Sequence, residues 1–450
     1  MVRKFLLYIL IGWGLMAAAT AQPVELTQDQ AKQIAQVQLQ DGNPEVTRSI
    51  ALALLQINPD DFVGLMLLAS AEIGLGNWDD AAKAAKRAFR NANGDIQHVD
   101  AARLVASAHF RAKQYTRSEI WLRRAFNNAP AGPAQDAVRQ DFAQVKQVNP
   151  LTVQLNFSAA PNSNINNGSS SEQILIWNLP FILSADARAL SGIEVSGSVD
   201  LSYRLSQSTN YATDLGLTLF GRVYELSPEA ARAAPNVSGS DYAFSLAEVS
   251  LTHIRNFAEF TGPTTFDLTL GKNWYGGDPY TSYGRATVGQ KFLVSDTTGI
   301  DLTFGYEQQE LLSTGVQSDI YTVAAGITHR LGNKDTLGFQ LQQQQTNSDD
   351  VTNENTSLRA LVNYSFGRPI WGTQVFLNLS AQQRDYDLSV YSVDGRHDLT
   401  LSAGASFVFL KLSYFGFSPS VSLETSQTNS NIDLFDRDST AIRFGVQSAF

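Results

Sequence analysis

The sequence contains no cysteine among its 450 residues. This absence excludes a disulfide framework, a thiolate metal site and a lipid-modified N-terminal cysteine. Basic residues are also in the minority, with 33 Lys and Arg against 43 Asp and Glu, and they form no basic run. Since nucleic-acid binding requires a basic footprint, we expect no nucleic-acid partner.

Long hydrophobic runs are scarce. The chain opens with a short basic segment, an apolar stretch over residues 5–15 and a small-x-small site that ends at Ala21. This order predicts a cleaved signal peptide over residues 1–21. The alternative is a retained membrane anchor, but a membrane-spanning helix needs roughly 20 apolar residues and this stretch is shorter. The next apolar stretch, 174–183, is short and interrupted by proline, so a membrane location requires a closed β-barrel.

The composition changes abruptly at Asn149-Pro150. Residues 22–148 are rich in Ala, Leu, Gln and Lys with helical spacing, whereas residues 151–450 are rich in Thr, Ser, Gly, Asn and aromatics with period-two alternation. We therefore predict an α + β protein of two domains, a helical domain over 22–148 and a β domain over 151–450.

The helical half repeats itself. A turn followed by small residues in a helix occurs at 42–59, 76–89 and 113–130. This pattern resembles the tetratricopeptide family, whose unit is two antiparallel helices in about 34 residues. The places where two helices approach closely are assigned to Ala69, Ala81, Ala88, Ala106 and Ala125, with Thr47 and Ser118 departing from the usual alanine. An unrelated helical bundle is the alternative.

Stacked repeats of this kind form a concave surface from the first helix of each pair. The alignment assigns to it Val63, Met66, Ser70, Ile73, Asp100, Arg103, Ser107 and Phe110. Such surfaces bind extended or helical polypeptide, so these residues are the candidate client-binding site of the protein. The alternative is that the apolar members pack in the core.

The second half alternates apolar and polar residues, as in the stretch Ile300, Leu302, Phe304 and Tyr306. One apolar and one polar face suit lipid outside and a wet lumen inside, which predicts a transmembrane barrel of the outer membrane. Connections after odd strands, such as 227–240, tend to be long, and those after even strands, such as 332–334, are usually short. The alternative is a soluble β-sandwich.

Fourteen strands are expected, and an even number returns the chain to the side from which it entered. Their expected ranges are 151–159, 191–206, 210–225, 241–256, 264–275, 281–294, 298–310, 318–331, 334–347, 356–367, 372–387, 396–409, 415–428 and 439–450. In the last strand, Ile442, Phe444, Val446 and Phe450 alternate. This ending resembles the signal read by the barrel-insertion machinery, which we expect as a partner beside membrane lipid.

An asparagine-rich segment, Pro161-Asn162-Ser163-Asn164-Ile165-Asn166-Asn167, follows the first expected strand. After a tetratricopeptide domain, this segment resembles the surface lipoprotein assembly modifier family, as do residues 184–192 and 274–280. Asn162 stands where the family's pattern has Asp. The resemblance implies a periplasmic helical domain and a fourteen-strand barrel that helps particular proteins, often surface lipoproteins, to cross the outer membrane.

The segment 161–190 is long for one connection and contains the apolar stretch 174–183. Because exposed apolar patches of this size are rare on soluble surfaces, we expect it partly inside the barrel, with the asparagine motif as a luminal gate. The alternative is that the apolar stretch extends the second strand.

Enzyme signatures are missing from the sequence. His253, His329 and His397 are widely separated, without a Ser/His spacing or a metal-ligand spacing, and there is no phosphate-binding glycine loop. Scattered histidines of this kind are luminal or interfacial polar residues. We therefore expect no enzyme, no cofactor and no metal. Two other functions stay open, a porin-like channel for small solutes and a structural or adhesive outer-membrane protein.

Overall fold

The computed structural model describes residues 26–176 and 179–448, so the expected signal peptide and Phe450 lie outside the described residues. The described chain forms two compact units, one that ends at Trp121 and one that begins at Leu122. Seven described helices precede the first strand, and the boundary between the units falls inside the sixth. They are α1 (Gln28–Gln40), α2 (Pro44–Ile57), α3 (Phe62–Leu75), α4 (Trp78–Arg90), α5 (Asp95–Arg111), α6 (Tyr115–Asn128) and α7 (Pro133–Val148).

Local signals set the ends of these helices. The Thr27 hydroxyl accepts a hydrogen bond from the Gln30 amide at the start of α1, in a capping box. Asp61 caps α3 by accepting from the Gly64 amide at 2.7 Å. Gly76 ends α3 in the left-handed region with φ 80°, where glycine carries no Cβ penalty. No helix in the described part of the chain is long and apolar enough to cross a membrane.

Small side chains fill the contacts between the helices, as the repeat pattern predicts. Ala69, Ala81 and Ala88 are fully buried, and Ala106 and Ala125 are at most 2% exposed. Consecutive helices contact one another from α1 through α5. The prediction of tetratricopeptide-like helical pairs is confirmed, because only small residues permit backbones this close.

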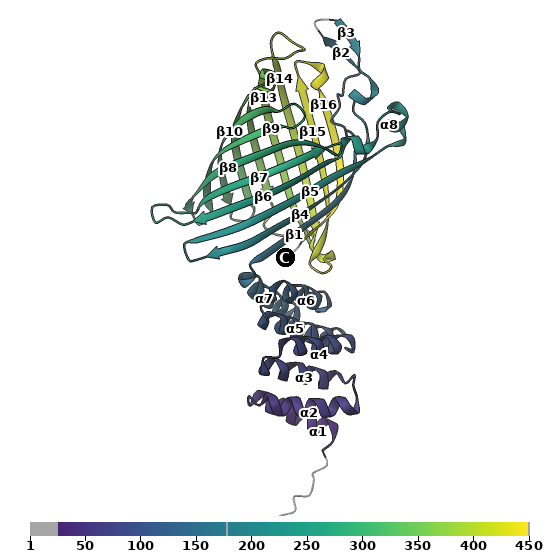
Figure 1. Ribbon diagram of the computed structural model, residues 1–450, viewed down its shortest axis with the longest axis vertical. Helices are drawn as coiled ribbons and strands as arrows, with labels where there is room; N and C mark the ends of the chain where they lie inside the picture. Colours follow the sequence, from purple (N-terminus) through teal and green to yellow (C-terminus); the bar gives the residue numbers. More distant parts are fainter. Residues whose placement is uncertain (1–25, 177–178, 449–450) are drawn as a thin grey trace, which may run out of the picture. The chain divides into compact units, whose positions relative to one another are not determined.

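The second unit contains a closed barrel of fourteen antiparallel strands, each paired with its sequence neighbours, and β1 pairs with β16 to close it (Figure 1). The strands are β1 (Leu151–Asn162), β4 (Gly192–Gln207), β5 (Tyr211–Leu226), β6 (Phe244–Arg255), β7 (Thr264–Tyr275), β8 (Asp278–Ser295), β9 (Thr298–Leu311), β10 (Val316–Arg330), β11 (Thr336–Ser348), β12 (Asn355–Ser365), β13 (Thr373–Tyr386), β14 (Arg396–Phe409), β15 (Phe417–Ser430) and β16 (Arg437–Ser448). All fourteen predicted strands are confirmed, with small shifts at their ends.

Register places apolar residues of neighbouring strands on one face of the wall. Phe304 lies opposite Val323, and Ala325 lies opposite Leu341. Phe304 and Val323 are 51% and 56% exposed, which is the arrangement of a wall that faces lipid rather than a protein core. The barrel therefore matches the predicted outer-membrane architecture.

Connections on the two rims of the barrel follow the predicted difference in length only in part, since 312–315 on one rim is short and 256–263 on the other is long. The loop rim carries the connections 163–191, 227–243, 387–395 and 431–436, and the opposite end is the turn rim. On the loop rim, however, β7 and β8 are joined only by Gly276 and Gly277, with φ 60° and 92°. Two glycines at positive φ form the tight hairpin turn that matches strand twist, so no long loop is needed there.

Candidate functional site

The candidate client-binding residues lie on one face of α3 and one face of α5, and these two helices contact each other. On α3, the intervening residues Leu65, Leu67 and Ala69 are buried, whereas Val63 is 42% exposed and Met66, Ser70 and Ile73 are half-buried. On α5, Asp100 is exposed, and Arg103, Ser107 and Phe110 are half-buried. The predicted face is thus separate from the helix core, although Met66 and Ile73 pack at its edge.

Each first helix is fixed to the turn that follows it by an equivalent side-chain contact five residues apart. Asn43 donates to Gln38 Oε1 at 3.0 Å, and Asn77 donates to Glu72 Oε2 at 2.6 Å. The third repeat uses His109, whose Nδ1 lies 2.8 Å from Gln114 Oε1. These three contacts, which we term turn locks, hold the first helices and the candidate face in place. The residue types differ between the repeats, so the sequence pattern does not predict the contacts.

His109 is the titratable member of these locks. Its side chain is 5% exposed, and burial lowers its pKa from the ordinary value of 6.5, against the smaller effect of Gln114. Since Gln114 Oε1 can only accept, Nδ1 carries the hydrogen of this contact.

The luminal wall carries paired charges. Arg285 on β8 contacts Glu248 on β6 at 3.0 Å and Glu307 on β9 at 3.3 Å. Arg443 on β16 reaches Glu194 on β4 at 2.6 Å, across the intervening β1. These pairs neutralise part of the charge on the luminal wall.

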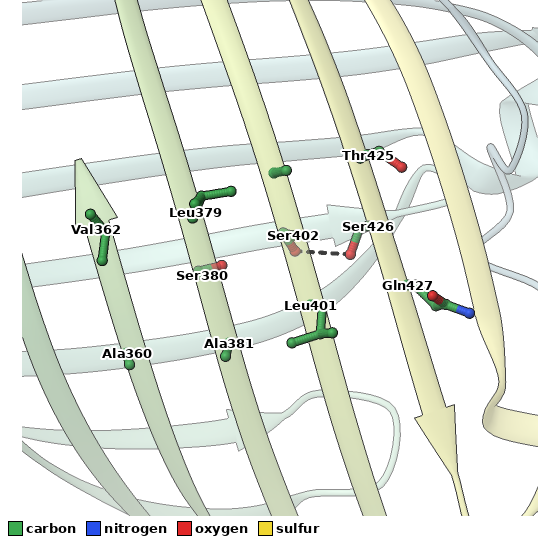
Figure 2. Close-up of a pocket in the computed structure, with 11 residues that line it drawn as sticks. Ala360, Val362, Leu379, Ser380, Ala381, Leu401, Ser402, Thr425, Ser426 and Gln427 are labelled. Atoms are coloured by element: carbon green, nitrogen blue, oxygen red, sulfur yellow. Dashed lines mark hydrogen bonds between the residues drawn. The ribbon is translucent and has the colours of Figure 1, made fainter. Parts of the chain in front are cut away.

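Hydroxyl groups form the other part of the luminal wall. Ser402 and Ser426 hydrogen bond across β14 and β15 at 3.0 Å, as Figure 2 shows. Thr400 and Thr428 repeat this contact at 2.9 Å nearer the loop rim, and Ser406 and Ser422 repeat it at 2.7 Å toward the turn rim. These short hydroxyl side chains thus satisfy one another across the two strands.

The asparagine motif lies at the loop rim, where β1 ends beside β16. Asn162 Oδ1 accepts from the Ser439 hydroxyl at 3.2 Å, and Asn164 Nδ2 donates to the carbonyls of Gly168 and Asp438 at 2.9 and 3.2 Å. Asn162, Asn164 and Asn166 together form what we term the Asn clamp.

Asn166 provides the tightest part of the Asn clamp. Its Nδ2 donates to the carbonyls of Asp186 and Arg188 at 2.9 and 2.7 Å, and its Oδ1 accepts from the Leu190 amide at 2.8 Å. Ile165 lies in an apolar cluster with Leu190 and residues of the connection 227–243. The motif therefore fixes the first connection against its own return and against the loop rim.

The apolar part of the first connection does not extend the second strand, which corrects that alternative. β2 (Gln173–Ile176) and β3 (Leu179–Ile182) instead pair only with each other as a two-stranded sheet, and β4 begins at Gly192. Ile174 is buried, but Phe181 and Ile182 are 46% and 78% exposed. The hairpin projects from the loop rim rather than into the lumen (Figure 1).

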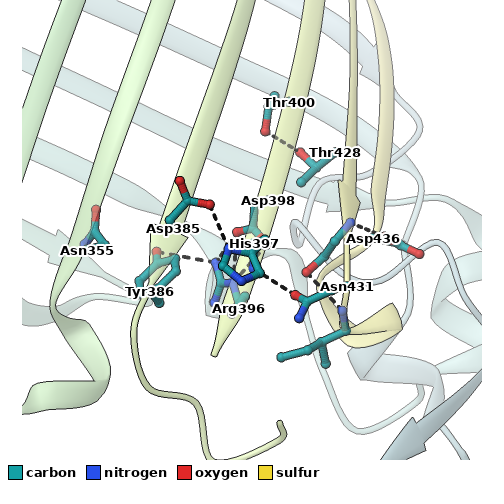
Figure 3. Close-up of polar contacts among 12 residues, drawn as sticks. Asn355, Asp385, Tyr386, Arg396, His397, Asp398, Thr400, Thr428, Asn431 and Asp436 are labelled. Atoms are coloured by element: carbon teal, nitrogen blue, oxygen red, sulfur yellow. Dashed lines mark hydrogen bonds and ion pairs between the residues drawn. The ribbon is translucent and has the colours of Figure 1, made fainter. Parts of the chain in front are cut away.

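A polar cluster closes the loop rim between β13 and β16, as Figure 3 shows. Arg396 pairs with Asp398 at 2.6 Å and stacks over the rings of Tyr386 and Phe435. Asp436, in the connection 431–436, accepts from the Ser430 amide at 2.7 Å, and burial raises its pKa. Its carbonyl also accepts from the Ser170 amide at 2.8 Å. This cluster joins the last connection to the first.

The three barrel histidines lie on different strands, and each has a separate partner. His253 contacts Thr213 at 2.9 Å, His329 contacts Thr298 at 2.8 Å, and His397 contacts Asp385 at 2.8 Å. Within the described residues, no three His, Asp or Glu side chains are arranged to hold a metal ion.

The final strand presents Ile442, Phe444 and Val446 on the outward face, at 43%, 55% and 40% exposure. Arg443, between two of them, points to the lumen and pairs with Glu194. The outward side chains form the alternating pattern that the sequence predicts for this strand.

These features define an outer-membrane β-barrel with a helical-repeat region in the same chain. Residues 152–450 match the model of the surface lipoprotein assembly modifier family, and the chain belongs to that family. No curated protein matches the chain.

Solved structures with similar parts share little sequence. The translocator chaperone SycD of Yersinia enterocolitica is 18% identical over 27% of this chain and 88% of its own, with a TM-score of 0.25. A bacterial polysaccharide outer-membrane secretin is 10% identical over 66% of this chain and 98% of its own, with a TM-score of 0.36. OccAB4 of Acinetobacter baumannii is 8% identical over 67% and 98%, with a TM-score of 0.33.

Proposed function

We propose that this protein delivers a polypeptide client, a surface lipoprotein or a small secreted protein, from the periplasm through the outer membrane. Family membership supports an outer-membrane role in the surface assembly of lipoproteins. The observation that carries the finer proposal is the face of α3 and α5, where Val63 is 42% exposed and Arg103 and Phe110 are half-buried. A face that combines apolar and charged residues in this way fits an unfolded chain.

The barrel fits the second step of the same path. Its paired charges and hydroxyl ladders provide a wet wall that a polar polypeptide passes without tight binding. The Asn clamp at the loop rim is our candidate for the gate, because it holds the first connection by side-chain amides that an arriving chain can replace. The family and the fold are not enzymatic types, and we propose that the protein is not an enzyme and needs no cofactor.

The direct test is surface display in cells. A lipoprotein encoded beside this protein is produced with it in a host that lacks both, and antibody binding to intact cells measures display. The double variant Val63→Asp with Phe110→Asp should abolish display, because both charges disfavour an apolar client segment. Val46→Asp, at an exposed position on α2, is the matched control and should display normally. Equal display by both variants would contradict the role of the helical face.

A porin-like channel is the second candidate, since the polar luminal wall also suits small solutes. The two functions are separated by measuring both client display and sugar uptake in cells with and without this protein. Delivery predicts that display depends on the protein and that sugar uptake does not. Uptake without display would favour the channel.

A further inference from the structure

The outward face of β12 to β15 contains a depression of about 490 Å³, shown in Figure 2. Ala360, Ala381 and Ala403 contribute one small side chain each from three adjacent strands. Ala360 lies opposite Ala381, and Ala403 lies opposite Leu379. Leu379 and Leu401 are 58% and 47% exposed, and their larger side chains border the depression. The alanines therefore leave an apolar hollow in a surface that faces the bilayer.

The depression lies where the outward face changes from apolar to polar. Toward the turn rim the next outward row contains Leu377, Ala405 and Leu423. Toward the loop rim, Thr425 lies opposite Ala403 and Gln427 lies opposite Leu401. A bound acyl chain would thus lie on the alanines and place its polar end beside Thr425 and Gln427.

The polar edge of the depression is neutral or acidic. Among the described residues that line it, none is Lys or Arg, and the outward residue opposite Gln427 on β16 is Asp438. Phosphate groups are recognised by Arg and Lys through charge-assisted hydrogen bonds. The edge therefore disfavours phosphate-bearing headgroups, whereas hydroxyl and carboxamide side chains match a neutral amide or ester.

We propose that this depression binds one acyl chain of a lipid-anchored polypeptide, with the neutral linkage of that lipid beside Thr425 and Gln427. The identity of the lipid rests on the proposed function. The acyl chains of a lipid-anchored client lie in the bilayer while its polypeptide passes through the barrel. A binding site on the outer wall would keep this anchor close to the barrel.

The test uses the full-length protein in phosphatidylcholine vesicles. One sample contains a synthetic peptide with an amide-linked acyl chain that bears a diazirine, and a second contains phosphatidylglycerol with the same chain. After illumination, mass spectrometry maps the labelled segments. The lipopeptide should label β12–β15 roughly tenfold more than β5–β8, which corresponds to about 1.4 kcal/mol. Phosphatidylglycerol should label both regions alike. Even labelling by the lipopeptide, or equal preference by both probes, would overturn the proposal.

Filling the depression is the next arm. Ala381→Phe with Ala403→Phe should remove the preference for β12–β15, while Ala405→Phe, outward on the same strand but outside the lining, should retain it. Gln427→Lys leaves the alanines in place and should draw phosphatidylglycerol to this face. This variant also keeps the test decisive if the double variant fails to fold. Even labelling with normal surface display would reject only the acyl site, and selective labelling without display would reject only the proposed function.

Discussion

Thr47 and Ser118 make the same hydrogen bond in different repeats. Each hydroxyl donates to the main-chain carbonyl of the residue twelve positions earlier, Thr47 to Ala35 at 3.0 Å and Ser118 to Ala106 at 2.8 Å. Both side chains are fully buried, and Ala81 occupies the equivalent position in the middle repeat. The departures from alanine are therefore a second solution to close helix packing, in which the hydroxyl is satisfied by the neighbouring helix.

Because the repeats bury these surfaces on each other, residues 22–148 should fold alone as a soluble, mainly helical domain. Circular dichroism of this fragment measures its helix content, and a random-coil spectrum under native conditions would contradict independent folding.

Ser118→Leu tests whether the helices pack specifically at this position. The bulkier side chain should lower the free energy of unfolding by about 1–3 kcal/mol.

The same domain should lose stability in mild acid through His109. Burial lowers its pKa in the folded state from the ordinary 6.5, so the unfolded chain takes up the proton first as the pH falls. The stabilisation is complete above about pH 6.5 and is lost as the pH falls toward the folded pKa. Urea midpoints of the fragment between about pH 7.5 and 5.5 measure this effect.

His109→Gln keeps an amide donor for Gln114 and should flatten that pH dependence. His98→Gln, on the same helix, is the control and should keep the loss in acid. A wild-type urea midpoint that stays constant between these pH values would contradict the lowered pKa of buried His109.

Much of this fold follows from the sequence because each half has one dominant period. In the barrel, alternate residues face lipid and water. The alternation around Phe304 and Val323 therefore predicts a strand at each position, even when the neighbouring strands are not known. Contacts between distant residues carry no such local signal. The bond of Asn162 to Ser439 joins residues 277 positions apart, and the alanine depression depends on cross-strand register. The apolar stretch of the first connection likewise gave no local sign that it pairs with itself as a hairpin at the loop rim.

The Asn clamp gives a prediction about permeability. Deletion of residues 162–171 removes the amides that hold the first connection to the loop rim, so leakage of large antibiotics through the outer membrane should rise. Asn166→Ala should raise leakage to a smaller extent, since it removes four hydrogen bonds. Asn353→Ala, in another connection of the loop rim, is the control. Unchanged permeability with normal barrel abundance would refute a gating role.

The C-terminal strand gives a prediction about assembly. Phe450→Ala, or deletion of Phe450, should reduce barrel insertion, because Ile442, Phe444 and Val446 form an outward apolar row that the terminal aromatic would complete. Heat-modifiable mobility and abundance in the outer membrane measure insertion. Normal values for the variant would count against this signal.

Translocation by the purified protein tests the central claim most directly. The full-length protein is reconstituted in liposomes, its lipoprotein client is added in an unfolded state on the side of the helical repeats, and protease protection of the client is measured over time. We predict that the client becomes protected, and that Val63→Asp with Phe110→Asp prevents it while leaving the barrel folded. A client that stays fully protease-sensitive beside a correctly folded wild-type barrel, in liposomes that admit small sugars, would contradict delivery and favour a channel.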